Sequence, residues 1–373
     1  MITVREIFTR KDLREFVKFP FQIFRNNPYW IPPIISEELA TFELEKNPVF
    51  EHAEARFFLA YKNEQLAGRI AAIINHKEIN DQQLKKMRFG WFDVIDDISV
   101  TKALLEKVHD IGKKNLLEFV EGPVGFSNLD KVGVMTEGFD QLGTSLTWYS
   151  QPYYKDHLEQ LGYHPEKKFI ESYFYIKDID NTNFDRFAKI IETKYHFKAL
   201  NFNSTKDIYP YVNEMFGVFN ETYAKLASFV PISVKQINYF KEKYLPFINP
   251  EFVKFVADEH GSLIAIAITM PSYAKAMQKA KGHLFPFGFF HLLKAKRKND
   301  AVDFYLIGVL PEYQKKGVTA IIFSEFFKTY KKYNIKIARR TPELEDNYDI
   351  QLIWKNFNPK VYIRRATYLK KIH

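Results

Sequence analysis

The stretch Pro311-Glu-Tyr-Gln-Lys-Lys-Gly-Val-Thr-Ala320 lies between an apolar run, residues 302–310 (VDFYLIGVL), and a helix-like run, residues 321–330 (IIFSEFFKTY). This order predicts a strand, a short turn and a helix. Backbone N–H groups that begin a helix have no intrahelical partner, and the helix dipole places partial positive charge there. Gly317 would let an anion approach the backbone closely, and Lys315 and Lys316 add charge. The stretch therefore predicts a phosphate-binding turn, with an ordinary strand-to-helix turn as the alternative.

A faint internal repeat accompanies this stretch. Residues 9–24 (TRKDLREFVKFPFQIF) align with residues 204–219 (STKDIYPYVNEMFGVF), and both segments carry apolar residues at the i, i+3, i+4 spacing of one helix face. Thr9 and Ser204 are placed to cap these helices, because Ser and Thr side chains accept hydrogen bonds from the first backbone N–H groups. The repeat predicts two halves with the same order of elements.

The rest of the chain follows that order twice. The matching segments are residues 55–74 and 251–269 for hairpins, 89–95 and 302–310 for the next strands, 100–114 and 318–333 for the next helices, and 116–122 and 335–340 for the strands after them. Residues 170–180 predict the last strand of the first half, so we expect one domain at 1–180 and another at 181–373. The predicted fold class is α/β (α+β), with two tandem domains that each form a mixed, mostly antiparallel sheet flanked by helices.

The strand, turn and helix around residue 317 carry a specific resemblance. Val309 and Pro311 end the strand, and Gln314, two variable residues, Gly317, one variable residue and Thr319 follow. This pattern resembles the GNAT acyl-CoA-dependent N-acetyltransferases, whose turn binds the coenzyme A pyrophosphate through backbone amides. The resemblance implies acetyl-CoA (coenzyme A) as cosubstrate, held by Val309, Gln314, Lys315, Lys316, Gly317, Val318, Thr319 and, further along, Asn347. Thr319 departs from the Gly or Ala usual in the family.

The first half resembles tandem bacterial GNAT-like proteins through residues 47–50 (NPVF), 68–72 (GRIAA) and 121–139 (EGPVGFSNLDKVGVMTEGF). Its equivalent turn carries Asp96 and Asp97 in place of the glycine and lysines. These carboxylates would repel a pyrophosphate, since like charges about 4 Å apart cost roughly 1 kcal/mol even in water. We therefore expect the first half to wall the substrate site rather than to bind coenzyme A.

Acyl transfer to an amine needs a base, a polarised carbonyl and an acid for the departing thiolate. Asp303 begins an apolar strand at a place where the resemblance implies a general base, and a structural carboxylate is the alternative. Gly308 is expected to permit a distortion of that strand. The resemblance implies a tyrosine acid, but Trp354 occupies the aligned position. Tyr362 or Tyr348 would replace it, of which we retain Tyr362, and unassisted departure of the thiolate is the third alternative.

The composition excludes several kinds of site. The chain has no cysteine, which excludes disulfides, thiolate ligands and a cysteine nucleophile, and its ten histidines show no metal-ligand spacing, so we predict no metal. No apolar run approaches the roughly 18 residues that cross a bilayer, and the N-terminus is too charged for a secretory signal. We therefore expect a cytoplasmic protein without a membrane partner. The net charge of +9 suits a nucleic acid, a membrane surface or a phosphate-bearing cofactor, and no stable nucleic-acid partner is expected.

Three further segments leave alternatives open. Residues 121–140 have four glycines and little periodicity, which predicts an Ω-like loop or a wall of the acceptor site. Residues 284–294 (LFPFGFFHLLK) are typical of a core segment, with a cover over a hydrophobic acyl chain as the alternative. The basic residues 294–300 (KAKRKND) are expected to form a solvated loop, with a lid over a ligand, or contact with nucleic acid or a membrane, as alternatives.

These observations together predict an acyl-CoA-dependent N-acyltransferase whose second half is catalytic. The acyl group expected is acetyl, and the acceptor is an amine of a small molecule or peptide. The protein is expected to be a monomer or homodimer. Two other classes stay open: a GNAT-fold binding or scaffold protein without turnover, and an enzyme that transfers aminoacyl groups from charged tRNA.

Overall fold

The computed structural model describes residues 1–127, 129–224, 226 and 229–372. In this part of the chain thirteen strands form one sheet with the order β1-β2-β3-β4-β5-β13-β7-β12-β11-β10-β9-β8, and β6 pairs with β13 beside this path. The strands are β1 (Ile2–Glu6), β2 (Ala53–Lys62), β3 (Gln65–Asn75), β4 (Lys86–Val94), β5 (Phe119–Gly122), β6 (Val134–Glu137), β7 (His164–Tyr175), β8 (Lys198–Asn201), β9 (Val253–Ala257), β10 (Leu263–Pro271), β11 (Ala301–Val309), β12 (Ile337–Leu344) and β13 (Lys360–Lys371).

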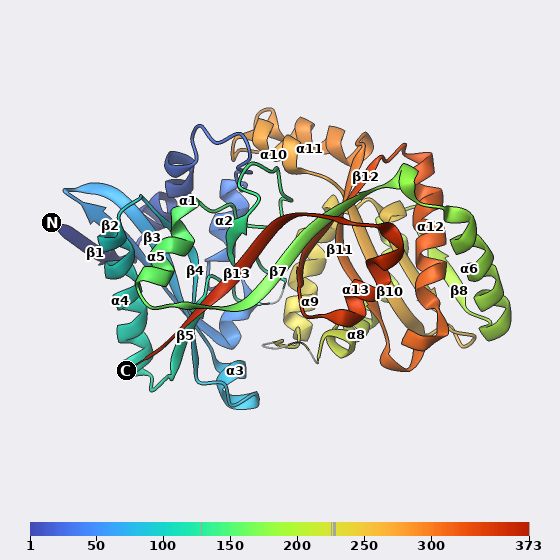
Figure 1. The fold of residues 1–373 in the computed structure, drawn as a ribbon, viewed down its shortest axis with the longest axis horizontal. Helices are drawn as coiled ribbons and strands as arrows, with labels where there is room; N and C mark the ends of the chain where they lie inside the picture. Colours follow the sequence, from blue (N-terminus) through green and yellow to red (C-terminus); the bar gives the residue numbers. More distant parts are fainter. Residues whose placement is uncertain (128, 225, 227–228, 373) are drawn as a thin grey trace.

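Helices cover both faces of this sheet (Figure 1). They are α1 (Arg10–Ile23), α2 (Ile35–Thr41), α3 (His76–Asp81), α4 (Ile98–Lys114), α5 (Tyr153–Gln160), α6 (Asn181–Tyr195), α7 (Thr205–Ile208), α8 (Val212–Tyr223), α9 (Val234–Tyr244), α10 (Ala274–Ala280), α11 (Gly288–Arg297), α12 (Val318–Lys332) and α13 (Tyr348–Trp354). Short 3-10 helices are η1 (Pro48–Glu51), η2 (Ile176–Asp178), η3 (Tyr209–Tyr211), η4 (Leu245–Phe247), η5 (Pro250–Phe252), η6 (Pro311–Lys316) and η7 (Lys355–Phe357).

The repeated helices begin where the sequence predicts. Thr9 caps α1, since its side chain accepts a hydrogen bond from the Asp12 backbone N–H at 3.1 Å, and Ser204 forms a capping box at the start of α7. Phe16 and Val17 are fully buried, as the predicted helix face requires. The second copy is not one continuous helix, because Pro210 lies in η3, between α7 and α8. A proline ring removes a backbone donor and clashes with the preceding turn, which explains the interruption.

The sheet is mixed and mostly antiparallel, as predicted. The hairpins β2–β3 and β9–β10 are antiparallel, while β4 pairs with β5, and β11 with β12, in parallel. The same order of elements therefore occurs twice, once in each half of the chain. Helix α4 packs on β3 and β4 in the first half, and α12 packs on β9 and against α6 in the second.

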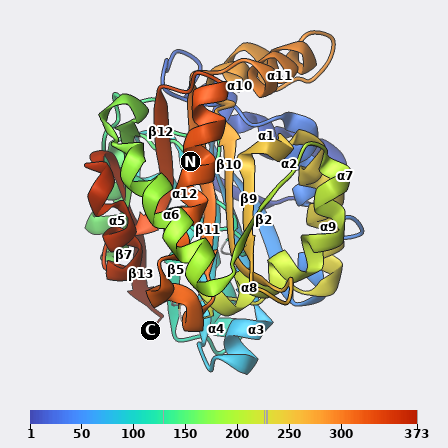
Figure 2. The ribbon, with the colours of Figure 1, turned by 90° about the vertical axis from the view of Figure 1, so that its right-hand side faces the viewer.

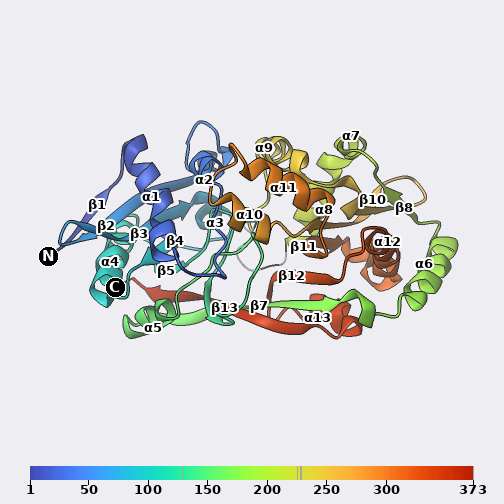
Figure 3. The same cartoon turned by 90° about the horizontal axis from the view of Figure 1, so that it is seen from above.

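The closing strands of the two halves lie together at the centre of the sheet. Strand β7 ends the first half in sequence but pairs with β12, and β13 ends the second half but pairs with β5. The two strands also pair with each other, and Figure 3 shows them running side by side along the molecule. The boundary predicted near Asp180 coincides with the N-cap of α6, but the hydrogen bonding of the sheet does not follow it. The domain division stays a prediction.

The segment 284–294 does not form core as expected. The Phe285, Phe287 and Phe290 side chains are 78%, 70% and 64% exposed, and Leu292 is the member of this segment that is buried in the apolar core. The basic cluster that follows is not a loop either, because Lys294, Lys296 and Arg297 form the last turn of α11. The apolar composition of the segment suggested burial but could not show that its aromatic side chains stay uncovered.

Candidate active site

The second half contains two parallel strands that separate partway along. Strands β11 and β12 are paired from Ala301 to Phe304, opposite Ile337 to Arg340, and not beyond. Past this point β12 continues along β7 after a register shift between Arg340 and Glu343. A cavity of about 810 Å³ opens between the separated ends, lined by residues 304–309 of β11 and 341–344 of β12. Unpaired backbone groups at such a divergence are available to a ligand.

A bulge in β11 accompanies the separation. Ile268 of β10 lies opposite Leu306 and Thr269 opposite Phe304, so Tyr305 is the extra residue. The bulge lies three residues before Gly308, and the expectation that Gly308 permits a distortion of the strand stays a prediction. A Cβ atom at Gly308 would meet the Thr222 side chain at 3.2 Å, so this glycine allows α8 to pack closely against the strand. The bulge depends on the register of β11 against β10, which the sequence of β11 alone does not reveal.

The turn into α12 leaves a helix N-terminus without a side-chain cap. Gly317 is the N-cap residue of α12, with φ +74°, and as a glycine it supplies no side-chain cap to the first turn. In the first half, Asp97 caps α4 by accepting hydrogen bonds from the Ser99 backbone N–H at 2.9 Å and from its hydroxyl. Its pKa is lowered to about 2, first by the Lys62 ammonium and then by Ser99. The first-half helix start thus already holds a carboxylate, whereas the start of α12 is open to an anion.

The eight residues expected to hold the coenzyme fall into two groups. Those that line the cavity are Val309, Gln314, Lys315, Thr319 and Asn347. The other three, Lys316, Gly317 and Val318, are not among its described lining residues. Val318 is buried in the core of the second half. Some residues of the turn therefore line the cavity, whereas Val318 points into the protein interior.

Gly317 is required for two reasons that the sequence did not show. Its positive φ is costly for residues with a Cβ atom, and an added Cβ would lie 2.7 Å from Ile191 Cδ1 on α6. The glycine therefore sets the turn and allows α6 to pack against it. Neighbouring Lys316 faces away from the cavity, since its Nζ lies 4.3 Å from the Tyr313 ring centroid and 5.9 Å from that of Tyr195. Lys315 is the lysine of this pair that lines the cavity.

Asn347 and the aromatic residues after it have structural contacts as well. The Asn347 side chain caps α13 by accepting a hydrogen bond from the Ile350 N–H at 3.4 Å. Trp354 lines the cavity and donates from its indole nitrogen to Glu343 Oε1 at 3.0 Å. Tyr348, the alternative acid, is 76% exposed. The position where the family carries a tyrosine is thus filled by a tryptophan that orients a carboxylate.

Asp303 and Tyr362 lie in a buried polar region and are not among the described residues that line the cavity. The Asp303 carboxylate is 3.9 Å from the Arg339 guanidinium, and one of its oxygens has no hydrogen-bond partner among the described residues. Within the same part of the chain, the buried Tyr362 hydroxyl has no partner either, and its ring packs edge-on against Tyr173. Their assignment as base and acid stays a prediction.

Asp303→Asn is expected to remove a pH dependence of stability. Burial raises the pKa of Asp303 to about 6, and Arg339 only partly offsets this. The unfolded chain, with an Asp pKa of about 3.9, binds this proton less tightly. The stabilising contribution of the Asp303 proton is therefore complete below about pH 4. It is lost as the pH rises from about 4 to past about 6, and the free energy of unfolding falls by about 3 kcal/mol over that range.

Urea unfolding at pH 4 and pH 8 measures most of this difference, which we expect to be much smaller in the Asn variant than in the natural protein. Asp300→Asn changes an exposed carboxyl three residues earlier and serves as the matched control. A fall of equal size in both variants would mean that another group titrates.

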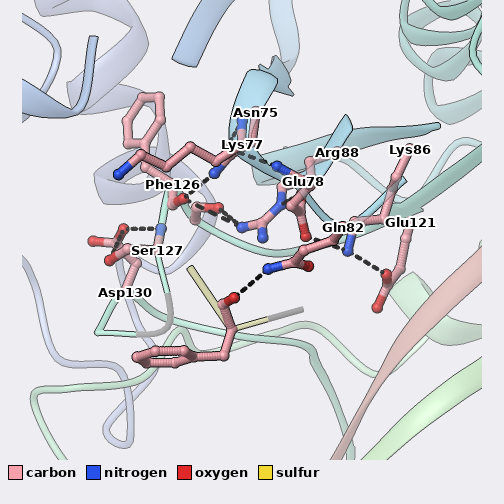
Figure 4. A network of polar contacts seen from close by, with 12 residues as sticks. Asn75, Lys77, Glu78, Gln82, Lys86, Arg88, Glu121, Phe126, Ser127 and Asp130 are labelled. Atoms are coloured by element: carbon pink, nitrogen blue, oxygen red, sulfur yellow. Dashed lines mark hydrogen bonds and ion pairs between the residues drawn. The ribbon is translucent and has the colours of Figure 1, made fainter. Parts of the chain in front are cut away.

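The first half supplies the opposite wall of the cavity. The described residues of the loop 124–132, other than Phe126, line the cavity. This confirms that the segment borders the cavity. Behind the loop, Figure 4 shows a network in which the Glu78 carboxylate lies between Lys86 and Arg88, at 2.7 and 2.6 Å. Gln82 extends the network to the second half by donating to the Phe229 carbonyl. The wall is therefore built from fixed charges.

Glu121 is a carboxylate of this network that reaches the cavity. It accepts hydrogen bonds from Lys86 at 3.1 Å, Lys167 at 2.8 Å and Thr367 at 3.1 Å, and all four residues line the cavity. Burial raises its pKa, but the Lys86 and Lys167 charges outweigh this and lower the pKa to about 2. A permanently ionised carboxylate therefore faces the cavity beside two ammonium groups.

Sequence reasoning missed Glu343 and Tyr223. Glu343 lines the cavity, and burial raises its pKa although Arg340 opposes this. The Tyr223 hydroxyl donates to the Ile307 carbonyl at 3.2 Å and also lies on the wall. Glu343 follows the predicted strand 335–340 by three residues, and its Arg340 partner is the signal that an i, i+3 search for ion pairs would have found.

Comparisons with known proteins agree with this architecture. No protein-family model matches the chain. It is 25% identical over 380 residues to "Protein YghO" of Escherichia coli (strain K12), covering 99% of this chain and 95% of that protein. It is 23% identical over 296 residues to "Bacterial ceramide synthase" of Caulobacter vibrioides (strain NA1000 / CB15N), covering 78% and 76%.

Among solved structures, a tandem GNAT protein from the clavulanic acid biosynthesis pathway is similar over 100% of this chain and 99% of that chain. The TM-score is 0.60, with 8% sequence identity. Such a low identity reports on backbone arrangement alone. The repeated elements, the parallel strand pair in each half and this neighbour agree: the chain has a tandem GNAT fold.

Proposed function

We propose that the protein is an acyl-CoA-dependent N-acyltransferase whose second half binds the coenzyme and whose first half forms the acceptor wall. One observation carries this proposal. The separated ends of β11 and β12 and the turn into the uncapped helix α12 border the same cavity, which charged residues of the first half close from the other side. A ligand with a phosphate group and an extended arm fits such a site.

The residues present suit coenzyme A. The open N-terminus of α12 and the Lys315 ammonium would hold its phosphates, and the part of β11 near Val309 that does not pair with β12 would lie along its extended arm. The Val309 carbonyl already accepts a hydrogen bond from Gln314 Nε2 at 3.1 Å. Thr319 is half-buried on the cavity wall, and its hydroxyl adds a donor there. When bound, acyl-CoA supplies an acyl group activated as a thioester.

The acceptor amine must lose a proton before it can attack. We assign its removal to Glu343, because this carboxylate lines the cavity and its raised pKa makes it a stronger base than an ordinary glutamate. Trp354 and Arg340 hold the carboxylate in place. Asp303, the base predicted from the sequence, is the competing candidate.

The acceptor proposed is a small amine that carries an apolar portion. The cavity is lined by aromatic and aliphatic side chains of both halves, among them Leu129, Phe169, Phe219, Leu226 and Phe304. The ionised Glu121 would attract an ammonium group. One relative is named as a ceramide synthase, and a ceramide is an amide of a long-chain amino alcohol. A long-chain acyl group is therefore tested beside the acetyl group predicted from the sequence.

The test has a binding stage and a turnover stage. Calorimetric titration with coenzyme A and acetyl-CoA is expected to give micromolar affinity, and absence of binding would overturn the proposal.

Acetyl-CoA and palmitoyl-CoA are then each incubated with a long-chain amino alcohol, a polyamine and a short peptide, and amide products are detected by mass spectrometry. Glu343→Gln is expected to lower kcat about 100-fold, as loss of a general base does, while Asp303→Asn leaves kcat within about threefold. Binding without any amide product would favour a protein that has lost turnover.

A further inference from the structure

Four phenylalanines lie on the surface at one turn of the chain. Phe285 and Phe287 belong to the connection between α10 and α11, and Phe289 and Phe290 to the first turn of α11. Their exposed fractions are 78%, 70%, 40% and 64%. Phe289 stacks with Phe285 and meets Phe290 edge-on, at centroid distances of 6.5 and 6.2 Å. Contiguous apolar patches of this kind on a protein surface mark interaction sites.

The same segment is strongly basic. We call residues 274–298 the aromatic–basic hairpin. It contains no Asp or Glu, and its cations are Lys275, Lys279, Lys281, Lys294, Lys296, Arg297 and Lys298. All of these except Lys296 are exposed. None of these cations forms an ion pair with any described residue of the protein. The positive charge is therefore available to a partner.

The hairpin is held firmly in its place. The Gly282 carbonyl accepts a hydrogen bond from the Ile35 N–H at 2.9 Å, and the Gln278 side chain donates to the Pro28 and Trp30 carbonyls at 2.7 and 3.0 Å. On the other side, Lys296 Nζ donates to the Pro246 carbonyl at 2.8 Å. These bonds attach the hairpin to both halves. Figure 2 shows α10 and α11 standing out from the body of the molecule. The rings are exposed by a fixed backbone arrangement.

The hairpin does not cover the candidate active site. Among the described residues that line the cavity, none belongs to 274–298. The alternative that residues 284–294 cover an acyl chain within that cavity therefore has no support from the geometry. No helix within the described parts of the chain is long and apolar enough to cross a membrane. A surface that inserts shallowly needs no such helix.

We infer that the aromatic–basic hairpin docks on the surface of an anionic lipid bilayer. The phenylalanine rings enter the boundary between headgroups and acyl chains, where apolar aromatic surface is stabilised, and the surrounding cations contact the lipid phosphates. The charge of the hairpin is complementary to such a surface. The sequence-based expectation of no membrane partner rested on the absence of a spanning segment, which this mode of contact does not require.

A bilayer fits these observations better than a nucleic acid does. Proteins that stack single-stranded nucleic acid on aromatic rings space those rings along a groove that follows the backbone of the strand. Here the four rings are clustered between residues 285 and 290 on a protruding element. An acidic protein would contact the cations but would leave the phenylalanines unexplained.

Vesicle sedimentation tests the inference with the full-length protein and two kinds of vesicle, one of phosphatidylcholine alone and one that also contains phosphatidylglycerol. The natural protein is expected to bind the anionic vesicles at least about tenfold more tightly. Phe285→Ser/Phe287→Ser/Phe290→Ser and Lys279→Glu/Lys294→Glu are each expected to lower this binding about tenfold or more.

The matched controls are Phe8→Ser, an exposed ring on another element, and Lys107→Glu/Lys114→Glu on α4. Both are expected to keep the binding of the natural protein. Circular dichroism and melting curves confirm that every variant is folded. The inference is overturned if the natural protein does not sediment with anionic vesicles or if the controls lose binding equally. It is also overturned if the lysine variant alone loses binding while a competing oligonucleotide displaces the protein, because the partner would then be recognised by charge only.

Discussion

Lys315→Glu is expected to weaken acetyl-CoA binding about 30-fold, whereas Lys316→Glu weakens it less than about threefold. The two substitutions make the same change of charge at adjacent positions, but only Lys315 lines the cavity. Reversing one charge in contact with a phosphate in a well-solvated site weakens the interaction free energy by about 2 kcal/mol. This corresponds to the 30-fold loss of affinity. Lys316 instead lies over the Tyr313 ring, at 4.3 Å from its centroid.

Calorimetric titration at low and high salt measures both affinities. The difference between the variants is expected to shrink at high salt, because ions screen exposed charges. Lys315→Glu does not threaten folding, since a carboxylate near the N-terminus of α12 interacts favourably with the helix dipole. Equal losses in both variants would show that the turn acts through overall charge, and an unchanged affinity in both would place the coenzyme elsewhere.

Arg365→Met is expected to lower the free energy of unfolding by about 3–5 kcal/mol, the usual cost of leaving a buried charge without its partner. The Arg365 guanidinium is 1% exposed and donates twice to Glu171 Oε1, at 2.8 and 2.6 Å. It also donates to the backbone carbonyls of Val132, Gly133 and Trp148. One side chain from β13 therefore fixes β7 and the loop that borders the cavity.

Arg364→Met is the matched control, because the neighbouring arginine is 36% exposed and pairs with Glu137 and Glu345 on the surface. Its expected cost is below about 1 kcal/mol. Burial raises the pKa of Glu171 and Arg365 opposes this, so the loss in Arg365→Met should be larger at pH 8 than at pH 5. Chemical unfolding at both values measures it. The double variant Arg365→Met/Glu171→Gln should recover part of the loss, and no recovery would mean that the backbone contacts dominate.

Local signals in the sequence were sufficient for the repeated hairpins and for the strands and helices that follow them in both halves. Thr9 and Ser204 cap helices as expected, since capping involves residues at most three positions apart. The contrast between Asp97 and Gly317 also follows from the chain itself, because a carboxylate at a helix start occupies the groups that an anion would need. These features were predictable because their causes lie within one turn of the residue concerned.

The composition of the site was predictable only in part. Sequence placed Lys315 and Lys316 together, but the 3-10 turn η6 directs only the former to the cavity. It pointed to Gly308 in β11 but could not show the bulge at Tyr305, which depends on the register against β10. Glu343 escaped notice because its importance comes from Trp354, eleven residues later. Each of these outcomes depends on which neighbour a side chain meets after folding.

The sequence by itself determined the repeated order of strands and helices, the glycine start of α12 and the carboxylate cap at the equivalent helix of the first half. Capping, turn geometry and hydrophobic periodicity are local, so they can be read from short stretches. Only the tertiary structure decided that β7 of the first half pairs with β12 of the second, and that β13 of the second half pairs with β5 of the first. It also decided that Glu121 faces the same cavity as Lys315. Pairing between strands far apart in the chain is selected by the packing of whole layers, and no single segment encodes that choice.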